Sequence, residues 1–456
     1  MTNKATSNGK VNLTRRRLLL GMAAAPFVIR PSSWASTTSN PDVIIIGAGA
    51  AGLGAAVTLS DLGVSFVMIE AQSRIGGRAY TDHHTFGVPY DMGCHWLNYG
   101  RVNPWLDYGK TLGFTLTPVP DDDYDKYGLF VGNRKASAAE VKAYDDAYNH
   151  IEEKIGWVAE KSNNPDISPA DAIKLESKWD KLSAYMMGPL DTAKEFDDFS
   201  CQDWWETPGS DPYFCKEGYG ALVAHYGRKL PVQLATPAQG INWQGPGVQV
   251  QTSEGTISGK VVIITVSTGV LAADKIKFTP ALPVKKQESF HYISMGTYNN
   301  VALQFSKDFF GLGPDRYVDY VNEDGTNPGG MLTNMGGTNL TYVYTGGDFG
   351  RDLELAGVNA AVEWGLNEVI KIYGSNVRNH FIKGMFTRWG EHPWTLGSYA
   401  AAEPGYFHMR AELRQTIADK LFFAGEATHP LQWATCGGGL LSGINAANNV
   451  AAVLET

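Results

Sequence analysis

Cysteine is scarce in this sequence: its four copies form no CxxC pair and no spacing typical of zinc ligands. No metal site is therefore expected, and a disulfide between Cys201 and Cys215 is allowed but unsupported. Positive charge is also scarce, because 38 Lys and Arg face 47 Asp and Glu for a formal net charge of −9. That balance argues against a nucleic acid partner. No apolar run reaches the length of a membrane-spanning helix, so no stable membrane insertion is expected.

The first 35 residues predict an export signal rather than folded structure. Thr14–Leu19 contains a twin arginine, Leu18–Ile29 is a mildly apolar region, and Ser33–Ala35 has the small residues of a cleavage site. Cleavage before Ser36 would change the net charge from −9 to −15, because six Lys and Arg and no acids are lost. Twin-arginine export carries folded proteins, so we expect a periplasmic or secreted location.

The stretch from residue 41 to residue 78 contains the clearest motif. The β-branched run Val43–Ile46 leads into a turn with Gly47, Gly49 and Gly52, and a small-residue helix follows to about residue 62. A second apolar run then ends in Glu70. The glycines allow a tight turn, approach of a pyrophosphate and close helix packing, while the acid would accept hydrogen bonds from ribose. This order predicts a dinucleotide-binding βαβ unit with the phosphates at the helix N-terminus.

The segments that follow this unit resemble the flavin-containing amine oxidase family, which includes monoamine and polyamine oxidases. After the ribose-binding acid come Gly76–Arg78 and then Asp91–Trp96, as in the family's segments along the cofactor. An arginine beside a pyrophosphate can donate two hydrogen bonds to it. The resemblance implies FAD rather than NAD.

The resemblance is also dense near the C-terminus. Trp389–Tyr399, Leu421–Thr428 and Gly437–Gly443 match the family's W-x(3)-P, GSY, FAGE and closing-helix pattern. Between the two ends, the alternating strands after residue 230 resemble the returning FAD segment, with Ala238 where the family usually has Val. The matches imply FAD contacts at Gly47, Gly49, Ala51, Gly52, Glu70, Ala71, Gly77, Arg78, Gly93, Cys94, His95, Trp96, Ala238, Trp389, Gly425, Glu426 and Thr435.

Three positions near the expected flavin ring depart from the family, and a fourth keeps its residue. Asn300 replaces the lysine that holds a water against flavin N5, unless it simply ends a strand, and it carries no charge to assist oxygen reduction. Ser398 replaces the cysteine that attaches FAD in monoamine oxidases, so FAD should be bound without a covalent bond. Tyr399 keeps one wall of the aromatic cage around the amine. The second tyrosine is Thr435 here, and Trp433 can rebuild that wall.

The predicted fold is α/β, with a Rossmann-like FAD-binding domain and an α+β substrate-binding domain. At 456 residues the chain is long enough for two such cores. The discontinuous FAD-binding domain should comprise residues 41–118, 216–275 and 395–456. The substrate-binding domain should comprise residues 119–215 and 276–394. Helices are expected at Ala138–Glu160 and within Pro169–Leu190.

The expected reaction is FAD-dependent oxidation of an amine C–N bond, with Asn300, Tyr399, Thr435 and Trp433 as catalytic candidates. No second GxGxxG unit follows a strand, so electrons should come from the organic substrate. Dioxygen, a redox protein or a quinone could accept them, and a homodimer is allowed.

One alternative is an amino-acid oxidase or C–C desaturase of the same fold, in which Arg388 or Arg316 binds a carboxylate. Another is an exported flavin-binding factor without turnover. His95, His392 and His429 are expected to be structural rather than proton carriers.

Overall fold

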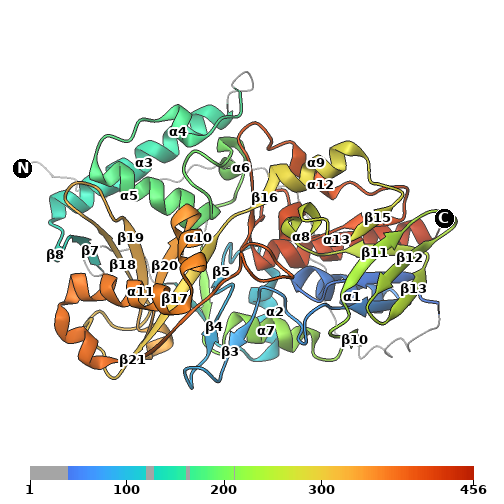
Figure 1. Ribbon diagram of the computed structural model, residues 1–456, viewed down its shortest axis with the longest axis horizontal. Helices are drawn as coiled ribbons and strands as arrows, with labels where there is room; N and C mark the ends of the chain where they lie inside the picture. The colour runs from blue at the N-terminus through green and yellow to red at the C-terminus, as the bar shows by residue number, and fades with distance from the viewer. Residues whose placement is uncertain (1–39, 120–127, 161–164, 210, 456) are drawn as a thin grey trace, which may run out of the picture.

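The computed structural model describes residues 40–119, 128–160, 165–209 and 211–455. The expected export signal at residues 1–35 lies outside these ranges. Figure 1 shows two halves side by side, with strands β17 to β21 in one half and helices α1 and α13 in the other. In the described residues, no helix is long and apolar enough to cross a membrane.

A parallel five-stranded sheet forms the centre of the nucleotide-binding half. Its order is β10 (Val232–Gln233), β2 (Phe66–Ile69), β1 (Val43–Ile46), β14 (Val261–Ile264) and β23 (Leu421–Phe423). Every residue of the inner strands β2, β1 and β14 is buried, because layers cover both faces of the sheet. The predicted strand–turn–helix unit is confirmed, with α1 at Ala50–Asp61.

Different elements cover the two faces of this sheet. Helices α1, α7 (Tyr219–Gly227) and α13 (Cys436–Leu454) pack on one face. The other face packs against a four-stranded sheet and against α8 (Thr268–Ala272), α9 (Val284–Tyr292) and α12 (Met409–Arg414). The order in that smaller sheet is β13 (Gly255–Gly259), β12 (Val248–Thr252), β11 (Ala238–Asn242) and β15 (Lys277–Thr279). These contacts place β15 and α9 with the nucleotide-binding half. The sequence-based boundary, between residues 275 and 276, assigns both elements to the substrate-binding domain.

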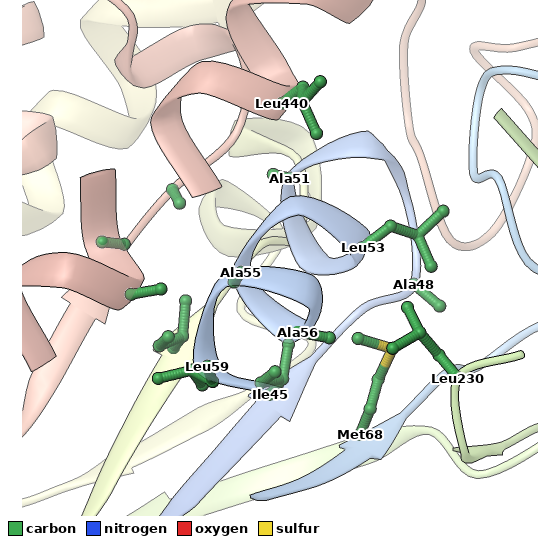
Figure 2. Close-up of a cluster of buried hydrophobic side chains, with 14 of the residues drawn as sticks. Ile45, Ala48, Ala51, Leu53, Ala55, Ala56, Leu59, Met68, Leu230 and Leu440 are labelled. Atoms are coloured by element: carbon green, nitrogen blue, oxygen red, sulfur yellow. The ribbon is translucent and has the colours of Figure 1, made fainter. Parts of the chain in front are cut away.

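Small residues bring α1 against α13. A side chain on Gly443 would lie 1.9 Å from the Ala51 carbonyl oxygen, and one on Gly54 would lie 2.7 Å from Leu440. Figure 2 shows Leu440 beside α1, whose apolar residues Leu53 and Leu59 are buried in the cluster that includes Ile45 and Met68 of the sheet. The approach of the two helices therefore depends on the missing Cβ atoms.

The substrate half is built on a seven-stranded sheet. Its order is β21 (Phe381–Phe386), β17 (Tyr298–Phe305), β20 (Leu340–Gly346), β19 (Gly329–Thr333), β18 (Arg316–Val321), β7 (Gly128–Val131) and β8 (Arg134–Lys135). Helices α10 (Gly347–Ala356) and α11 (Val358–Tyr373) pack on one face. The other face carries a second cluster that includes Tyr90, Phe214 and Tyr342. This second face lies toward the segments that follow the nucleotide-binding unit.

A group of helices completes the substrate half: α3 (Ala138–Glu160), α4 (Pro169–Ala172), α5 (Lys178–Tyr185), the π-helix η1 (Met186–Thr192) and α6 (Cys201–Trp205). The prediction for Ala138–Glu160 is confirmed to the residue. Within Pro169–Leu190 the chain forms three short helical pieces.

The remaining elements are short. They are β3 (Thr81–Asp82), β4 (Tyr90–Asp91), β5 (Trp96–Leu97), α2 (Pro104–Leu112), β6 (Leu116–Pro118), β9 (Tyr213–Cys215), β16 (Ile293–Met295), β22 (Ala400–Ala402), and the 3₁₀ turns η2 (Met335–Gly337), η3 (Ser375–His380) and η4 (Glu426–Thr428). Strand β16 pairs with β22 and thereby joins the two halves near Tyr399.

The α1–α13 contact predicts that Gly443→Ala destabilises the protein. The added methyl would lie 1.9 Å from the Ala51 oxygen, and overpacking of this kind costs about 1–3 kcal/mol. Thermal unfolding should show a lower Tm. Gly209→Ala is the matched control, because a Cβ there has no described atom within 4 Å. Equal Tm values for the two variants would contradict this account of the interface.

Candidate functional site

The first part of the site is the turn between β1 and α1. Gly47 has φ of +102°, and a Cβ on Gly52 would lie 1.9 Å from the Gly47 oxygen. Helix α1 begins after Gly49, has no acid in its first turn and shows no side-chain cap among the described residues. Its first N–H groups and its dipole are therefore available to an anion. Ala51 lies in this first turn and is buried.

Glu70 is held by the same turn. Its Oε2 accepts a hydrogen bond from the Ala48 N–H at 2.7 Å. Its Oε1 accepts one from the N–H of Gln72, the residue after Ala71, at 2.8 Å. Burial raises the pKa of Glu70, and these backbone donors oppose that rise. Thr236 N donates to the Glu70 carbonyl, which brings the returning segment before Ala238 beside the acid. The arrangement fits the adenosine half of a dinucleotide.

Arg78 joins three distant segments. Its Nη1 donates to the Ser398 carbonyl at 2.8 Å and to Glu426 Oε1 at 3.0 Å. The other Glu426 oxygen accepts from the Ala434 N–H at 2.9 Å. The structure therefore brings together Gly77–Arg78 and Gly425–Glu426, which the sequence predicts to meet at the cofactor.

Gly93 and Trp389 form a tight junction beside Arg78. A Cβ on Gly93 would lie 1.7 Å from the Arg78 oxygen and 3.2 Å from the Trp389 ring. Trp389 Nε1 donates to the Met92 carbonyl at 3.0 Å, and Cys94 N donates to the Arg78 carbonyl at 3.3 Å. These contacts require glycine at position 93.

His95 has a carboxylate partner that the sequence did not reveal. Its Nδ1 lies 2.9 Å from Asp91 Oδ2, and Asp91 also accepts hydrogen bonds from Thr81 Oγ1, Tyr219 N and Gly220 N. Since a carboxylate is an acceptor, Nδ1 carries a hydrogen, and in the neutral imidazole the lone pair is then on Nε2. Nε2 is buried and has no hydrogen-bond partner in the described residues.

Several aromatic rings surround this nitrogen on the second face of the seven-stranded sheet. The His95 ring lies 5.2 Å from Trp96, and Trp96 lies 5.9 Å from Tyr344. Trp96 Nε1 donates to the Tyr317 hydroxyl at 2.7 Å. The sequence predicts a role at the site for Trp96 but not for Tyr317 or Tyr344. The signal that could have found Tyr344 is its alternation with Tyr342 on one strand.

Tyr298 connects these rings to Tyr399. Its ring centroid lies 6.4 Å from Tyr344 and 5.8 Å from Tyr399. The Tyr399 hydroxyl donates to the Leu190 carbonyl at 2.8 Å. Burial raises the pKa of Tyr298, Tyr344 and Tyr399 well above the ordinary value, so all three phenols stay neutral. Tyr399 therefore has the ring of Tyr298 as its aromatic neighbour.

Asn300 lies on this aromatic face of β17. Its register partner is Tyr344 on β20, and its backbone N–H donates to Thr387 Oγ1 at 2.9 Å. The side chain is 1% exposed, yet Oδ1 has no described hydrogen-bond partner. The neighbouring Asn299 points the other way and donates to Glu354 Oε1 at 2.7 Å. An unsatisfied buried oxygen of this kind fits a bound water or ligand.

Ser398, Thr435 and Trp433 have defined contacts. Ser398 Oγ donates to the Tyr298 carbonyl at 2.7 Å and accepts from the Tyr298 N–H at 2.8 Å. Thr435 caps α13, since its Oγ1 accepts from the Gly438 N–H at 3.0 Å. Trp433 Nε1 donates to the Asp203 carbonyl at 3.2 Å, and the guanidinium of Arg410 lies over its ring at 5.0 Å. Among the described ring contacts, Tyr399 pairs with Tyr298 and not with Trp433.

His392 and His429, the two other histidines expected to be structural, lie in loops. His429 Nδ1 accepts hydrogen bonds from Leu431 N and Gln432 N. Burial, followed by the charges of Arg410 and Arg414, lowers the pKa of His429 to about 4. Burial also lowers the pKa of His392. A neutral His429 that fixes a turn fits the structural role expected for it.

The comparisons with known proteins agree with this geometry. Residues 174–451 match the family described as flavin containing amine oxidoreductase, and residues 45–108 match an NAD(P)-binding Rossmann-like domain. The chain is 27% identical to polyamine oxidase 4 of Oryza sativa subsp. japonica, over 92% of this chain and 91% of that protein. It is 28% identical to polyamine oxidase 2 of Arabidopsis thaliana, over 86% of this chain and 84% of that protein.

Solved structures show the same fold. Cyclohexylamine oxidase from Brevibacterium oxydans superposes with a TM-score of 0.75 at 22% identity, covering 91% of this chain and all of that chain. Wild-type putrescine oxidase bound to putrescine superposes with a TM-score of 0.74 at 17% identity, covering 91% and 99%. Because the family match covers more than half of the 456 residues, the chain belongs to the flavin-containing amine oxidoreductase family and is an FAD-dependent enzyme that oxidises amines.

Proposed function

We propose that the enzyme oxidises the C–N bond of a neutral aliphatic amine beside the aromatic cluster of Trp96, Tyr298, Tyr344 and Tyr399. The observation that supports this most directly is the unsatisfied acceptor Asn300 Oδ1 on the aromatic face of β17. His95 Nε2, which is an acceptor in the neutral imidazole with its hydrogen on Nδ1, is a second buried atom without a described partner beside the same rings. Aromatic faces and lone pairs suit an amine, whose N–H groups need acceptors and whose carbon chain needs an apolar wall.

The cofactor site is proposed to follow the residues that the structure brings together. The α1 N-terminus and the Gly47–Gly52 turn would hold the pyrophosphate, and Glu70 would bind the ribose. Arg78 and Glu426 would lie along the cofactor, with the N-terminus of α13 toward the flavin end. Bound FAD supplies the two-electron chemistry by accepting a hydride from the amine α-carbon. The resulting imine is then hydrolysed by water, while the chain supplies orientation and excludes solvent.

We propose that FAD is held without a covalent bond. Position 398 has a hydroxyl in place of a thiol, and both hydrogen bonds of Ser398 Oγ go to the Tyr298 backbone. Acid precipitation of the purified protein should therefore release all flavin absorbance into the supernatant. Absorbance that stays with the pellet would overturn this part of the proposal.

The substrate class is tested by anaerobic mixing with a panel of amines. Putrescine, cyclohexylamine and longer polyamines belong in the panel, because relatives carry those names. At least one amine should bleach the flavin absorbance, with a rate that rises as the neutral amine fraction rises with pH. Amino acids and alcohols of similar size serve as controls.

Two outcomes would favour the alternatives. Bleaching by an amino acid but by no amine would indicate a carboxylate-binding site, for which Arg316 stands beside Tyr317 at the start of β18. Arg388 fits that role poorly, since it is partly exposed and pairs with Glu391. Bleaching by dithionite but by no organic substrate would indicate a flavin-binding factor without turnover.

We propose that the reduced enzyme passes its electrons to an acceptor other than dioxygen, or to dioxygen only slowly, because Asn300 supplies no positive charge. Asn300→Lys should speed the reaction of the anaerobically reduced enzyme with oxygen by about tenfold or more. A positive charge stabilises the negative charge that develops beside it during this reaction. Asn300→Met is the matched control, because methionine is similar in length to lysine and carries no charge. Equal oxygen rates for the two variants would refute an electrostatic role for this position. Stopped-flow reoxidation with oxygen, a cytochrome and a quinone separates the acceptors.

We further propose that the protein is exported after folding and acts in the periplasm or outside the cell. The support is the order of twin arginine, apolar region and small-residue site in residues 14–35. The N-terminal residue of the exported protein, expected at Ser36, tests this. A homodimer stays a prediction without structural support.

A further inference from the structure

A buried ion pair joins the two halves of the protein beside the proposed site. Asp203 lies in α6, in the helix group of the substrate half, and Arg410 lies in α12, in the nucleotide-binding half. Arg410 Nε donates to Asp203 Oδ1 at 2.8 Å, and Arg410 Nη2 donates to Asp203 Oδ2. Asp203 is 1% exposed and Arg410 is 2% exposed. The contact is therefore two-pronged and shielded from water, which fixes the two side chains relative to each other.

Asp203 also holds the strand that follows Tyr399. Its Oδ2 accepts a hydrogen bond from the Ala402 N–H at 2.8 Å. The Ala402 carbonyl accepts one from the Ser200 N–H at 2.9 Å, and the Ser200 hydroxyl accepts one from the Asp203 N–H at 2.9 Å. Both backbone groups of Ala402 are thus bound by the N-terminal end of α6, three residues after Tyr399.

Arg410 holds the turn that follows Glu426. Its Nη1 donates to the carbonyl of Ala427, the next residue in η4, at 2.6 Å. Glu426 itself binds Arg78 through Oε1 and the Ala434 N–H through Oε2. The place of the Glu426 carboxylate among the cofactor segments therefore depends on where Arg410 holds the backbone of η4.

Trp433 makes a third contact with the pair. Its Nε1 donates to the Asp203 carbonyl at 3.2 Å, and the guanidinium of Arg410 lies over its ring at 5.0 Å. A guanidinium above an aromatic face is attracted to it. Two charged residues thus contact the strand after Tyr399, the turn η4 and the loop before α13.

We propose that Asp203 and Arg410 are positioning residues for amine oxidation, which hold Tyr399 and Glu426 in a fixed arrangement around the bound flavin. Burying two charges is costly, and apolar residues of similar volume often give equal or better stability. Stability alone therefore does not account for the pair. Positioning does, because the carboxylate can bind the guanidinium and the Ala402 N–H together, and the guanidinium has a further N–H for Ala427. The inference rests on the proposed place of the flavin among these segments.

The test is Asp203→Asn, which keeps the size of the side chain but replaces one acceptor oxygen with an NH2 group. That group must face either the guanidinium or the Ala402 N–H, which are donors as well. In anaerobic stopped flow with an amine that reduces the wild type, the limiting rate of flavin reduction should fall about tenfold or more, because small misplacements of the reacting groups are costly. The amine concentration that gives half of that rate should change much less, since the lost interaction orients the groups rather than binding the amine.

A second measurement needs no amine. Because the pair holds η4 and hence Glu426, FAD should dissociate severalfold faster from Asp203→Asn than from the wild type. Flavin fluorescence after dilution of the holoenzyme measures this rate. Arg410→Lys is the second variant, since it keeps the charge but loses the planar fork. It should show the same two changes, and it replaces Asp203→Asn if that variant yields no flavin-containing protein.

Glu368→Gln is the matched control, because it also neutralises a buried carboxylate. Glu368 is 1% exposed, and it accepts hydrogen bonds from Lys371 Nζ at 2.5 Å and from Asn327 Nδ2 at 2.7 Å. These partners lie outside the proposed site. The control should lower the Tm and leave both rates per bound flavin as in the wild type.

The outcomes separate positioning from a purely structural role. A lower Tm in Asp203→Asn and Arg410→Lys, with wild-type rates of flavin reduction and FAD release, would overturn the proposal. Failure of both variants to fold, with Glu368→Gln folded, would show that the pair is required for folding and would overturn it as well. A wild-type flavin that no amine reduces would instead overturn the proposed function, and the rate of FAD release would still test the pair.

Discussion

The site depends on the contact that Arg78 makes with segments more than 300 residues away. One guanidinium nitrogen binds the Ser398 carbonyl and the Glu426 carboxylate, so the first βαβ unit, the segment before Tyr399 and the strand end before α13 meet at one point. A charged donor shared by two acceptors gains more than a neutral one would. Without it, the partly buried Glu426 carboxylate would lose its charged partner, and the two ends of the chain would lose their polar link.

The seven-stranded sheet presents different side chains on its two sides because successive residues of a strand point to opposite faces. Asn299 points toward Glu354 and Trp389, where it satisfies buried polar groups. Asn300 points to the other face, beside the rings of Tyr298 and Tyr344. Two identical side chains thus differ in role: one is saturated by the protein, and the other has an oxygen left for a ligand or water.

Local patterns made the nucleotide-binding half predictable. The glycines around Gly47 and the apolar run Val43–Ile46 act over a few residues, so the strand, turn and helix could be read directly, and motif resemblance placed Arg78 and Glu426 together. The aromatic cluster was only partly predictable. Tyr298 and Tyr344 meet through pairing of β17 with β20, and Asp91 reaches His95 through the fold of a loop. Trp433 was chosen by its spacing from Thr435, but its direction is set by Asp203 and Arg410, which no local pattern encodes.

The charge balance at the site gives Asn300 its importance. Arg78 lies among the proposed cofactor segments, and its ion pair with Glu426 offsets its charge. Arg74 donates to the Gly77 carbonyl of the same segment at 2.8 Å. With an amide at position 300, the N-terminus of α13, which is proposed to face the flavin, is a group that would favour negative charge there. Thr435 accepts from only one N–H of that helix, so other N–H groups of the first turn stay available. Such a site would stabilise charge on a bound flavin through a fixed dipole, whereas the neutral amide of Asn300 adds no positive charge to attract a small anion such as superoxide.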